Sequence, residues 1–104
     1  MTRRSRAGAI PAAWRRVARI FTALGDPHRQ RILLMFERGA RLTVGEIVAA
    51  STLSRTAVAH HLRVLRDAGV LKSEKAGREV YFWPDVPVVR DALAAVQDYL
   101  AERH

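Results

Sequence analysis

The sequence predicts a small, mainly helical domain that carries one β-hairpin, an α+β arrangement. The chain has 104 residues, which fits one domain. Between residues 11 and 69, apolar residues recur at helical spacing in segments that glycines and capping residues separate. After Gly69 the spacing changes to that of two short strands around a glycine-containing turn, and a last helical segment follows.

The composition favours an anionic partner. Lysine and arginine number 18 against 10 aspartates and glutamates, a net charge of +8, and nucleic acid is the commonest partner of such a domain. The chain has 0 cysteines, which excludes disulfides and thiolate metal sites. No apolar run approaches the ~18 residues of a membrane span, and no apolar segment of a signal peptide follows the basic N-terminus. We therefore expect a cytoplasmic protein with no membrane partner.

The N-terminal segment, residues 1–8, is polar, basic and glycine-containing. We expect a disordered arm there and one folded domain over residues 9–104. A solvated terminus is favoured over an arm that reaches into a DNA minor groove.

Two helices are predicted first. One begins at Pro11 and ends at Gly25, with an apolar stripe of Trp14, Val17, Phe21 and Leu24. In the next, Asp26 is the expected N-cap, Pro27 the first helical residue, and Gly39 the end. Its apolar positions are Ile32, Leu33, Met35 and Phe36.

Residues 43–68 have the length and order of a helix-turn-helix. Thr43 and Glu46 have capping-box spacing and open a short helix through about Ala50. After a turn, Ser54 caps a longer helix that runs to about Ala68.

A basic hairpin and a final helix complete the chain. Residues 70–74 and 79–83 read as strands around the turn Lys75-Ala76-Gly77-Arg78. The last helix is predicted from about Pro87 to Arg103. Its apolar stripe consists of Val89, Leu93, Val96 and Leu100.

The helix that follows Ser54 has a core side and a polar side. At 100° per residue, Leu62 and Leu65 lie within ~40° of Val58 and form the core stripe. The opposite side is short near its start and basic further on, as a helix in a DNA major groove requires. That side carries Thr56, Ala59, His60 and Arg63, with Arg55 in the first turn.

His60 and His61 are adjacent but ~100° apart on this helix. They cannot readily share one metal ion, because helical chelation uses i, i+4 spacing. We expect His60 to contact DNA, with a merely solvated side chain as the alternative. We expect His61 to be a packed or hydrogen-bonded residue at the edge of the core.

The chain resembles the ArsR/SmtB family of winged-helix bacterial transcription regulators over about residues 14–103. Four segments carry the resemblance, in order and at the right spacing. They are F-T-A-L-G-D-P-H-R-Q-R-I-L-L (21–34), L-T-V-G-E-I (42–47), L-S-R-T-A-V-A-H-H-L-R-V-L-R-D-A-G-V-L (53–71) and G-R-E-V-Y-F (77–82).

The resemblance implies five helices, a two-stranded wing and a homodimer formed through the first and last helices. It implies a recognition helix at 54–66 in the major groove, a wing tip at 75–78 on the backbone or minor groove, and repression of transcription. The implied DNA-binding residues are Ser54, Arg55, Thr56, Ala59, His60, Arg63, Lys75, Gly77 and Arg78. The implied dimer interface is Trp14, Val17, Phe21, Val89, Leu93, Val96 and Leu100, whose alternative role is to cover the monomer core.

The metal sites of the family are not matched. Thr43 and Gly45 stand where a cysteine pair would be. The last-helix site falls on Asp85, Pro87, Asp98 and Ala101 or, one residue along, on Val86, Val88, Tyr99 and Glu102, and neither set supplies a histidine. A weakly bound divalent ion on Asp91, Asp98, Glu102 and His104 is the remaining candidate, although a solvated helix end is favoured. We predict no cofactor, and the effector is unknown.

The leading prediction is a homodimeric, sequence-specific regulator that binds double-stranded promoter DNA. The alternatives are a regulator that responds weakly to a divalent metal, a sequence-neutral architectural DNA binder, and a winged helix that binds proteins. An enzyme is not expected, because the sequence has no cysteine nucleophile, glycine-rich phosphate loop or carboxylate–histidine cluster at useful spacing.

Overall fold

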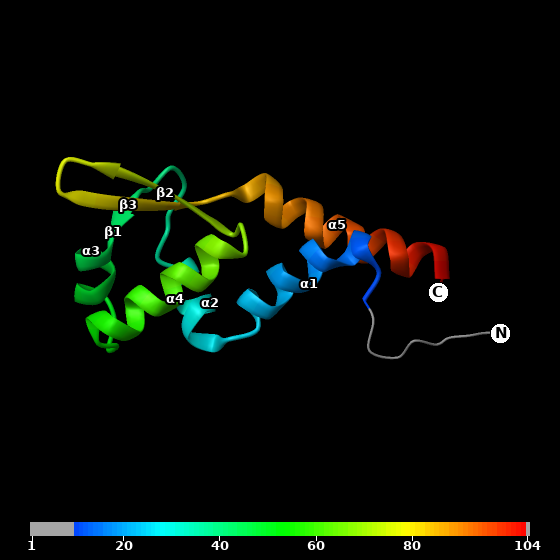
Figure 1. Cartoon of the computed structure of the whole chain (residues 1–104), viewed down its shortest axis with the longest axis horizontal. Coiled ribbons are helices and arrows are strands. Elements are labelled where there is room, and N and C mark those ends of the chain that lie inside the picture. Colours follow the sequence, from blue (N-terminus) through cyan, green and yellow to red (C-terminus); the bar gives the residue numbers. More distant parts are fainter. Residues whose placement is uncertain (1–9, 104) are drawn as a thin grey trace.

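A computed structural model, which describes residues 10–103, confirms a helix-rich domain with a small antiparallel sheet. In Figure 1, α1 and α5 lie side by side at one end, and the sheet lies with α3 and α4 at the other. The elements are α1 (Ala12–Leu24), α2 (Pro27–Leu33), β1 (Leu42–Thr43), α3 (Val44–Ala49), α4 (Arg55–Asp67), β2 (Leu71–Ala76), β3 (Glu79–Pro84) and α5 (Val86–Arg103). The predicted arm at residues 1–8 lies outside the described residues.

The predicted helix starts are confirmed where a side chain caps them. The Asp26 carboxylate accepts hydrogen bonds from the N–H groups of His28 and Arg29, at 2.7 and 3.3 Å. Thr43 and Glu46 form a complete capping box at the start of α3. The Ser54 hydroxyl accepts from the Ala57 N–H at 3.1 Å and opens α4. These caps satisfy backbone donors that the first helical turn leaves unpaired.

The prediction that the second helix continues to Gly39 is wrong, because α2 ends at Leu33. The Leu34 N–H still donates four residues back to Gln30, but those of Met35 and Phe36 donate three residues back to Ile32 and Leu33, which tightens the chain into turns. This lets both side chains pack against the core, while Leu34 is 85% exposed. Core packing therefore ends the helix earlier than the apolar spacing predicts. Gly39 lies in the following loop, where its φ of +78° favours glycine.

The sheet has three strands in the order β1-β3-β2, so the expectation of a hairpin alone is corrected. The short β1 pairs with the central strand, Leu42 opposite Phe82 and Thr43 opposite Tyr81. Two residues carry too little period-2 signal to be recognised as a strand. Moreover, Thr43 both ends this strand and caps α3, and its capping role dominates the sequence pattern.

The core lies between the helices and one face of the sheet. The predicted stripe of Val58, Leu62 and Leu65 is confirmed, since each is at most 1% exposed. On the sheet, Leu71 and Phe82 are buried among them. The rest of the buried cluster is Ile20, Ala23, Ile32, Ile47, Val70 and Ala92.

The first helix differs from its predicted stripe by having two apolar faces. Its buried residues are Val17, Ile20 and Ala23, whereas Phe21 is 38% exposed. Only part of the predicted stripe therefore serves the monomer core.

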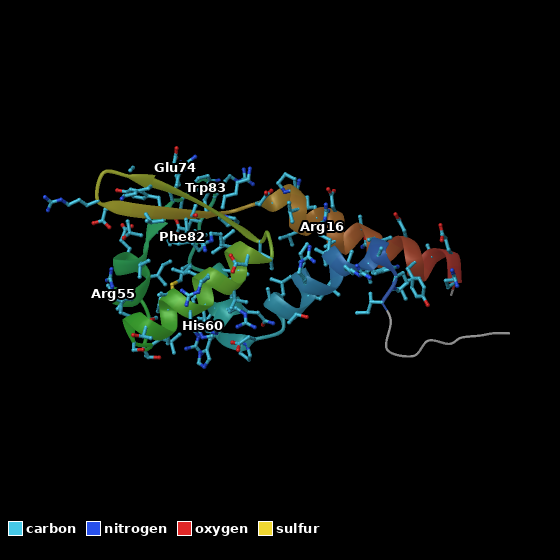
Figure 2. All side chains as sticks on the ribbon, viewed as in Figure 1. Arg16, Arg55, His60, Glu74, Phe82 and Trp83 are labelled. Atoms are coloured by element: carbon cyan, nitrogen blue, oxygen red, sulfur yellow. The ribbon has the colours of Figure 1, made fainter. Side chains whose placement is uncertain are left out.

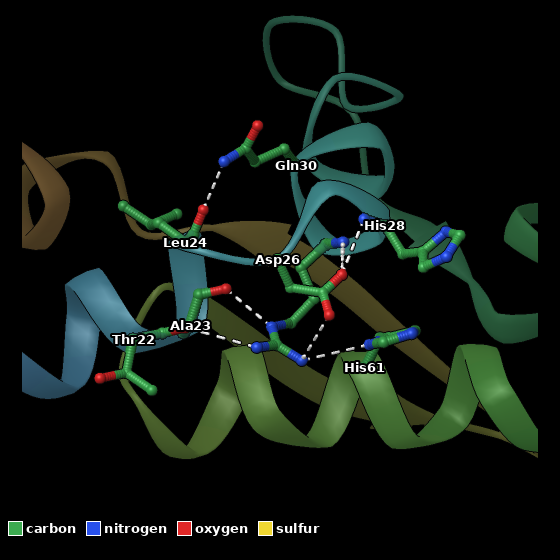
Figure 3. A network of polar contacts seen from close by, with 8 residues as sticks. Thr22, Ala23, Leu24, Asp26, His28, Gln30 and His61 are labelled. Atoms are coloured by element: carbon green, nitrogen blue, oxygen red, sulfur yellow. Dashed lines mark hydrogen bonds and ion pairs between the residues drawn. The ribbon is translucent and has the colours of Figure 1, made fainter.

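The Arg29 side chain, which comes from α2, bonds to groups on α1 and α4. Figure 3 shows the surrounding network, with Thr22 and Ala23 on α1 and His61 on α4. The Arg29 Nε donates to the Ala23 carbonyl at 2.7 Å and its Nη2 to the Thr22 carbonyl at 3.4 Å, which caps the C-terminus of α1. Its Nη1 lies 3.3 Å from His61 Nδ1 on α4 and 3.8 Å from the Asp26 carboxylate. The side chain is only 13% exposed, so these bonds are partly shielded from water.

Replacing Arg29 should destabilise the fold. Arg29→Ala removes a charged donor from two carbonyls and a ring nitrogen, so we expect a loss of about 1–2 kcal/mol in the free energy of unfolding by urea. Arg31→Ala is the matched control, because Arg31 lies exposed on the same helix and should change stability by less than about 0.5 kcal/mol. Equal effects of the two variants would contradict the bracing role of Arg29.

Candidate nucleic-acid interface

One face of α4 is polar and open to solvent. Arg55, Thr56, His60 and Arg63 are exposed, and Ala59 is half-buried between them and the core. Figure 2 shows His60 projecting from α4 at the outer edge of the molecule. Within residues 10–103, no hydrogen bond or ion pair engages the side chains of Arg55 or Arg63. This face therefore has unused donors and short side chains, which suit a DNA groove.

Ser54, included among the expected DNA-binding residues, has a local role. Its hydroxyl accepts the Ala57 N–H, and it lies exposed directly before the first turn of α4. A hydroxyl can accept and donate together, so the cap leaves its proton available to a phosphate.

The tip of the β2–β3 hairpin, which we call the wing tip, is exposed and basic. Gly77 and Arg78 form the two-residue loop, and Gly77 has φ +63°. A positive φ at the first loop position suits a type II′ turn, which favours glycine there. Lys75 pairs with Val80, and so shares the sheet face of Val80 and Phe82. Because Phe82 belongs to the core that contains α4, Lys75 lies on the α4 side of the wing.

A shallow groove of about 200 Å³ lies along the contact between α4 and the sheet. Arg63 and Arg66 line it on the helix side, and Val80 and Phe82 on the sheet side. Of the predicted recognition residues, Ala59 and Arg63 border this groove, and the wing-tip residues do not line it.

The wing is attached through a residue that the sequence reasoning missed. The guanidinium of Arg41 donates to Glu74 on β2 at 3.0 Å and lies 3.8 Å from the centre of the Trp83 ring on β3. Figure 2 shows Glu74 and Trp83 near each other on the hairpin. No local spacing rule joins Arg41 to residues more than 30 positions away, since only the fold brings them together.

The two adjacent histidines lie in different surroundings, as predicted. His60 is exposed, whereas His61 is half-buried and its Nδ1 faces Arg29 at 3.3 Å. The ring centres are 5.5 Å apart, and the His28 ring lies 5.8 Å from that of His61. Burial lowers the pKa of His61; the Asp26 carboxylate opposes this effect, and the Arg29 guanidinium adds to it. A bond from Arg29 requires His61 Nδ1 to be unprotonated.

No group of three metal-ligating side chains comes together within residues 10–103. Asp91, Asp98 and Glu102 are exposed along α5, and His104 lies outside the described residues. Thr43, at the position of the missing cysteine, is committed to capping α3. The weak divalent-ion site therefore remains a prediction.

An apolar surface runs along α1 and α5. Trp14 packs edge-on against Tyr99 with ring centres 5.9 Å apart, and Leu100 beside them is 50% exposed. Of the expected dimer residues, Phe21 and Leu93 are 38% and 47% exposed. Val17 and Val89 contribute less surface, since Val17 is 9% exposed and Val89 packs against the core.

Comparison with known proteins decides the family. Residues 26–73, which contain the helix-turn-helix, match the model of "Bacterial regulatory protein, arsR family". The chain is 30% identical over 74 residues to the transcriptional repressor SdpR of Bacillus subtilis, covering 71% of this chain and 81% of SdpR. The chain belongs to the ArsR family. Its members are transcription regulators with a DNA-binding fold, not enzymes.

Other ArsR-family comparisons agree. The SmtB homolog of Synechocystis, a transcriptional repressor, is 36% identical over 86 residues, which are 83% of this chain but only 64% of that protein. An ArsR-like regulator from Rhodococcus superposes with a TM-score of 0.79 at 28% identity, over 86% of this chain and 84% of that one.

A solution structure has the same architecture and is described as a homodimer. The homodimeric winged helix-turn-helix DNA-binding domain of Mb0332 from Mycobacterium bovis has a TM-score of 0.70 at 27% identity, over 99% and 93% of the two chains. In the described part of our ArsR-family chain, none of the helices is long and apolar enough to cross a membrane.

Acidification should destabilise the fold through His61. Because its pKa is lowered from 6.5, the unfolded chain binds the proton more readily than the folded chain. The stabilisation is therefore complete above pH 6.5 and is lost as the pH falls through the lowered value. We expect the melting temperature to be lower at about pH 5.5 than at about pH 7.5, with the loss occurring below the unfolded-state pKa.

His61→Gln should flatten this dependence, since a glutamine oxygen can accept from Arg29 without titrating. His60→Gln is the control and should keep the pH dependence of the melting temperature, because exposed His60 makes no bond to Arg29. If both variants retain the full fall in melting temperature, His61 is not the responsible group.

Proposed function

We propose that this ArsR-family protein is a sequence-specific repressor that binds promoter DNA as a homodimer. The observation that carries the proposal is the exposed polar face of α4 beside a basic wing; Arg55 and Arg63 on this face have no side-chain partner within the described residues. Thr56 and His60 can reach base edges, and Arg63 can pair with guanine or phosphate. Such a protein acts in the cytoplasm, where bacterial DNA lies.

The wing tip supplies the second contact. Lys75 and Arg78 are exposed, and Lys75 lies on the α4 side of the wing. Their side chains are placed to grip the phosphate backbone or enter the minor groove while α4 occupies the major groove. Phosphate contacts fix the register of the domain, and the residues on α4 provide the sequence preference.

The dimer is proposed to form through the apolar surface of α1 and α5. An exposed, contiguous apolar surface on a small domain marks an interaction site, and the similar Mb0332 domain is homodimeric. A two-fold axis would present two α4 helices to half-sites about one helical turn apart, ~34 Å.

The binding of promoter DNA tests the function. We expect the chain to bind its own promoter in the presence of excess random DNA and to bind more weakly as salt rises. A sequence-neutral architectural binder, the second candidate, would show the same salt dependence but no preference for promoter DNA over random DNA. Equal affinity for promoter and random DNA would therefore exclude the specific repressor.

Substitutions on α4 separate the two kinds of contact. Arg63→Ala should weaken promoter binding and, if Arg63 neutralises one phosphate, reduce the salt slope by about one. His60→Ala should weaken promoter binding more than His61→Ala does when the fraction of folded protein is matched. Arg31→Ala is the charge control, because Arg31 is exposed on α2 outside the proposed surface. Equal losses for Arg63→Ala and Arg31→Ala would indicate a general charge effect.

An aspartate in the apolar surface should separate the protomers. Phe21→Asp places a charge among α1 and α5 side chains, so we expect at least about tenfold weaker dimerisation by sedimentation. Leu34→Asp changes a more exposed leucine, 85% against 38% for Phe21, outside the proposed interface and should leave the dimer intact. A dimer that survives Phe21→Asp would place the interface elsewhere.

A further inference from the structure

A recess lies between the loop after α2, the end of β3 and the start of α5. Its volume is about 400 Å³, within the range of sites for small molecules. The α1–α5 surface proposed for dimerisation shares none of its lining residues. Neither the wing tip nor the exposed face of α4 contributes to it, so its occupant would be distinct from DNA.

The walls of the recess are aromatic and apolar. Phe36, Trp83, Pro84 and Val86 line it, and Val86 is 47% exposed. Trp83 pairs with Lys72 on the outward face of the sheet, opposite to the buried face of Phe82. Trp83 is half-buried and the Arg41 guanidinium covers part of its ring at 3.8 Å, so a flat apolar ligand would meet only the part of the ring that lines the recess.

Two arginines give the recess a positive charge. Arg38 has no hydrogen bond or ion pair in the described part of the chain. Arg41 is bound to Glu74, but the two side chains are 51% and 64% exposed, and such surface pairs exchange at little cost. Glu37 is the one acidic residue of the lining, so Arg38, Arg41 and Glu37 together carry a net charge of +1.

We propose that this recess binds a small organic anion with a flat apolar body, of the aromatic carboxylate class, and that this ligand is an effector. The apolar body lies against Phe36 and Trp83, and the carboxylate pairs with Arg38 and Arg41. Arginine binds a carboxylate through two parallel hydrogen bonds, which fixes the ligand in the recess.

The ligand acts on DNA binding by competing with Glu74. Arg41 holds the hairpin through Glu74 and Trp83, and Glu74 directly precedes Lys75 of the wing tip. When the carboxylate takes the Arg41 guanidinium, β2 loses this partner and the wing tip is less firmly placed. This regulatory step rests on the proposed repressor function, whereas ligand binding itself does not.

The test titrates benzoate against the full-length chain and follows Trp83 fluorescence in a Trp14→Phe background. Because Trp14 lies in the proposed dimer surface, calorimetry on the unaltered chain measures benzoate binding without this substitution. We expect saturable binding of benzoate. Benzamide has the ring without the charge and acetate has the charge without the ring, so both should bind at least about tenfold more weakly. Equal binding of all three, or no saturation with benzoate, would overturn the proposal.

Three variants locate the site. Arg41→Gln should weaken benzoate binding about tenfold, because it removes a charge-assisted hydrogen bond. Glu74→Gln should tighten binding, since it removes the competitor, and Arg31→Gln on exposed α2 should change nothing. If Arg41→Gln and Arg31→Gln behave alike, the anion binds elsewhere.

The regulatory step is measured separately by promoter affinity. Saturating benzoate should weaken promoter binding by the unaltered chain at constant ionic strength, with acetate as the salt control, and Glu74→Gln alone should weaken it in the same direction. Benzoate binding with unchanged promoter affinity would overturn the effector role. Failure of specific DNA binding would overturn the proposed repressor and leave the fluorescence result standing.

Discussion

The guanidinium of Arg29 braces the three helices α1, α2 and α4 against one another. It caps the carbonyls at the end of α1, comes from the first turn of α2, and meets α4 at His61. Helix ends leave carbonyls without partners, and a cation there offsets both the missing bonds and the negative end of the helix dipole. This side chain helps to set the positions of α1 and α2 relative to α4, the helix that carries the candidate DNA contacts. A shift of Arg29 would therefore also shift α4.

The wing is held in a different way. Its attachment, Arg41 with Glu74 and Trp83, is largely exposed, and a second pair, Lys72 with Asp85, spans 3.8 Å at the base of the hairpin. Exposed ion pairs and cation–π contacts each contribute at most about 1 kcal/mol. The domain therefore combines a recognition helix anchored in the core with a hairpin that Leu71 and Phe82 anchor at its inner face, while exposed contacts hold its outer face.

Local chemistry made much of this fold predictable. Asp26, Thr43 and Ser54 mark helix starts in the sequence and cap them in the structure, and the Val58 stripe fixes the face of α4. What escaped prediction depends on distant contacts. The strand β1 exists because β3 lies beside it, α2 ends early because Phe36 packs inward, and Arg41 meets Glu74 only in the folded chain. The individual residues that contact DNA and form the dimer interface stay predictions.

The two apolar faces of α1 link folding to assembly. Ile20 and Ala23 belong to the monomer core, while Trp14 and Phe21 face outward along the same helix. If the outward face closes a dimer, each association event also stabilises the helix that completes the core, and apparent stability rises with protein concentration. The lifetime of such a repressor in the cell would then depend on its concentration. Newly made or scarce chains would be the ones most open to proteolysis, so a minimum copy number would precede any regulation.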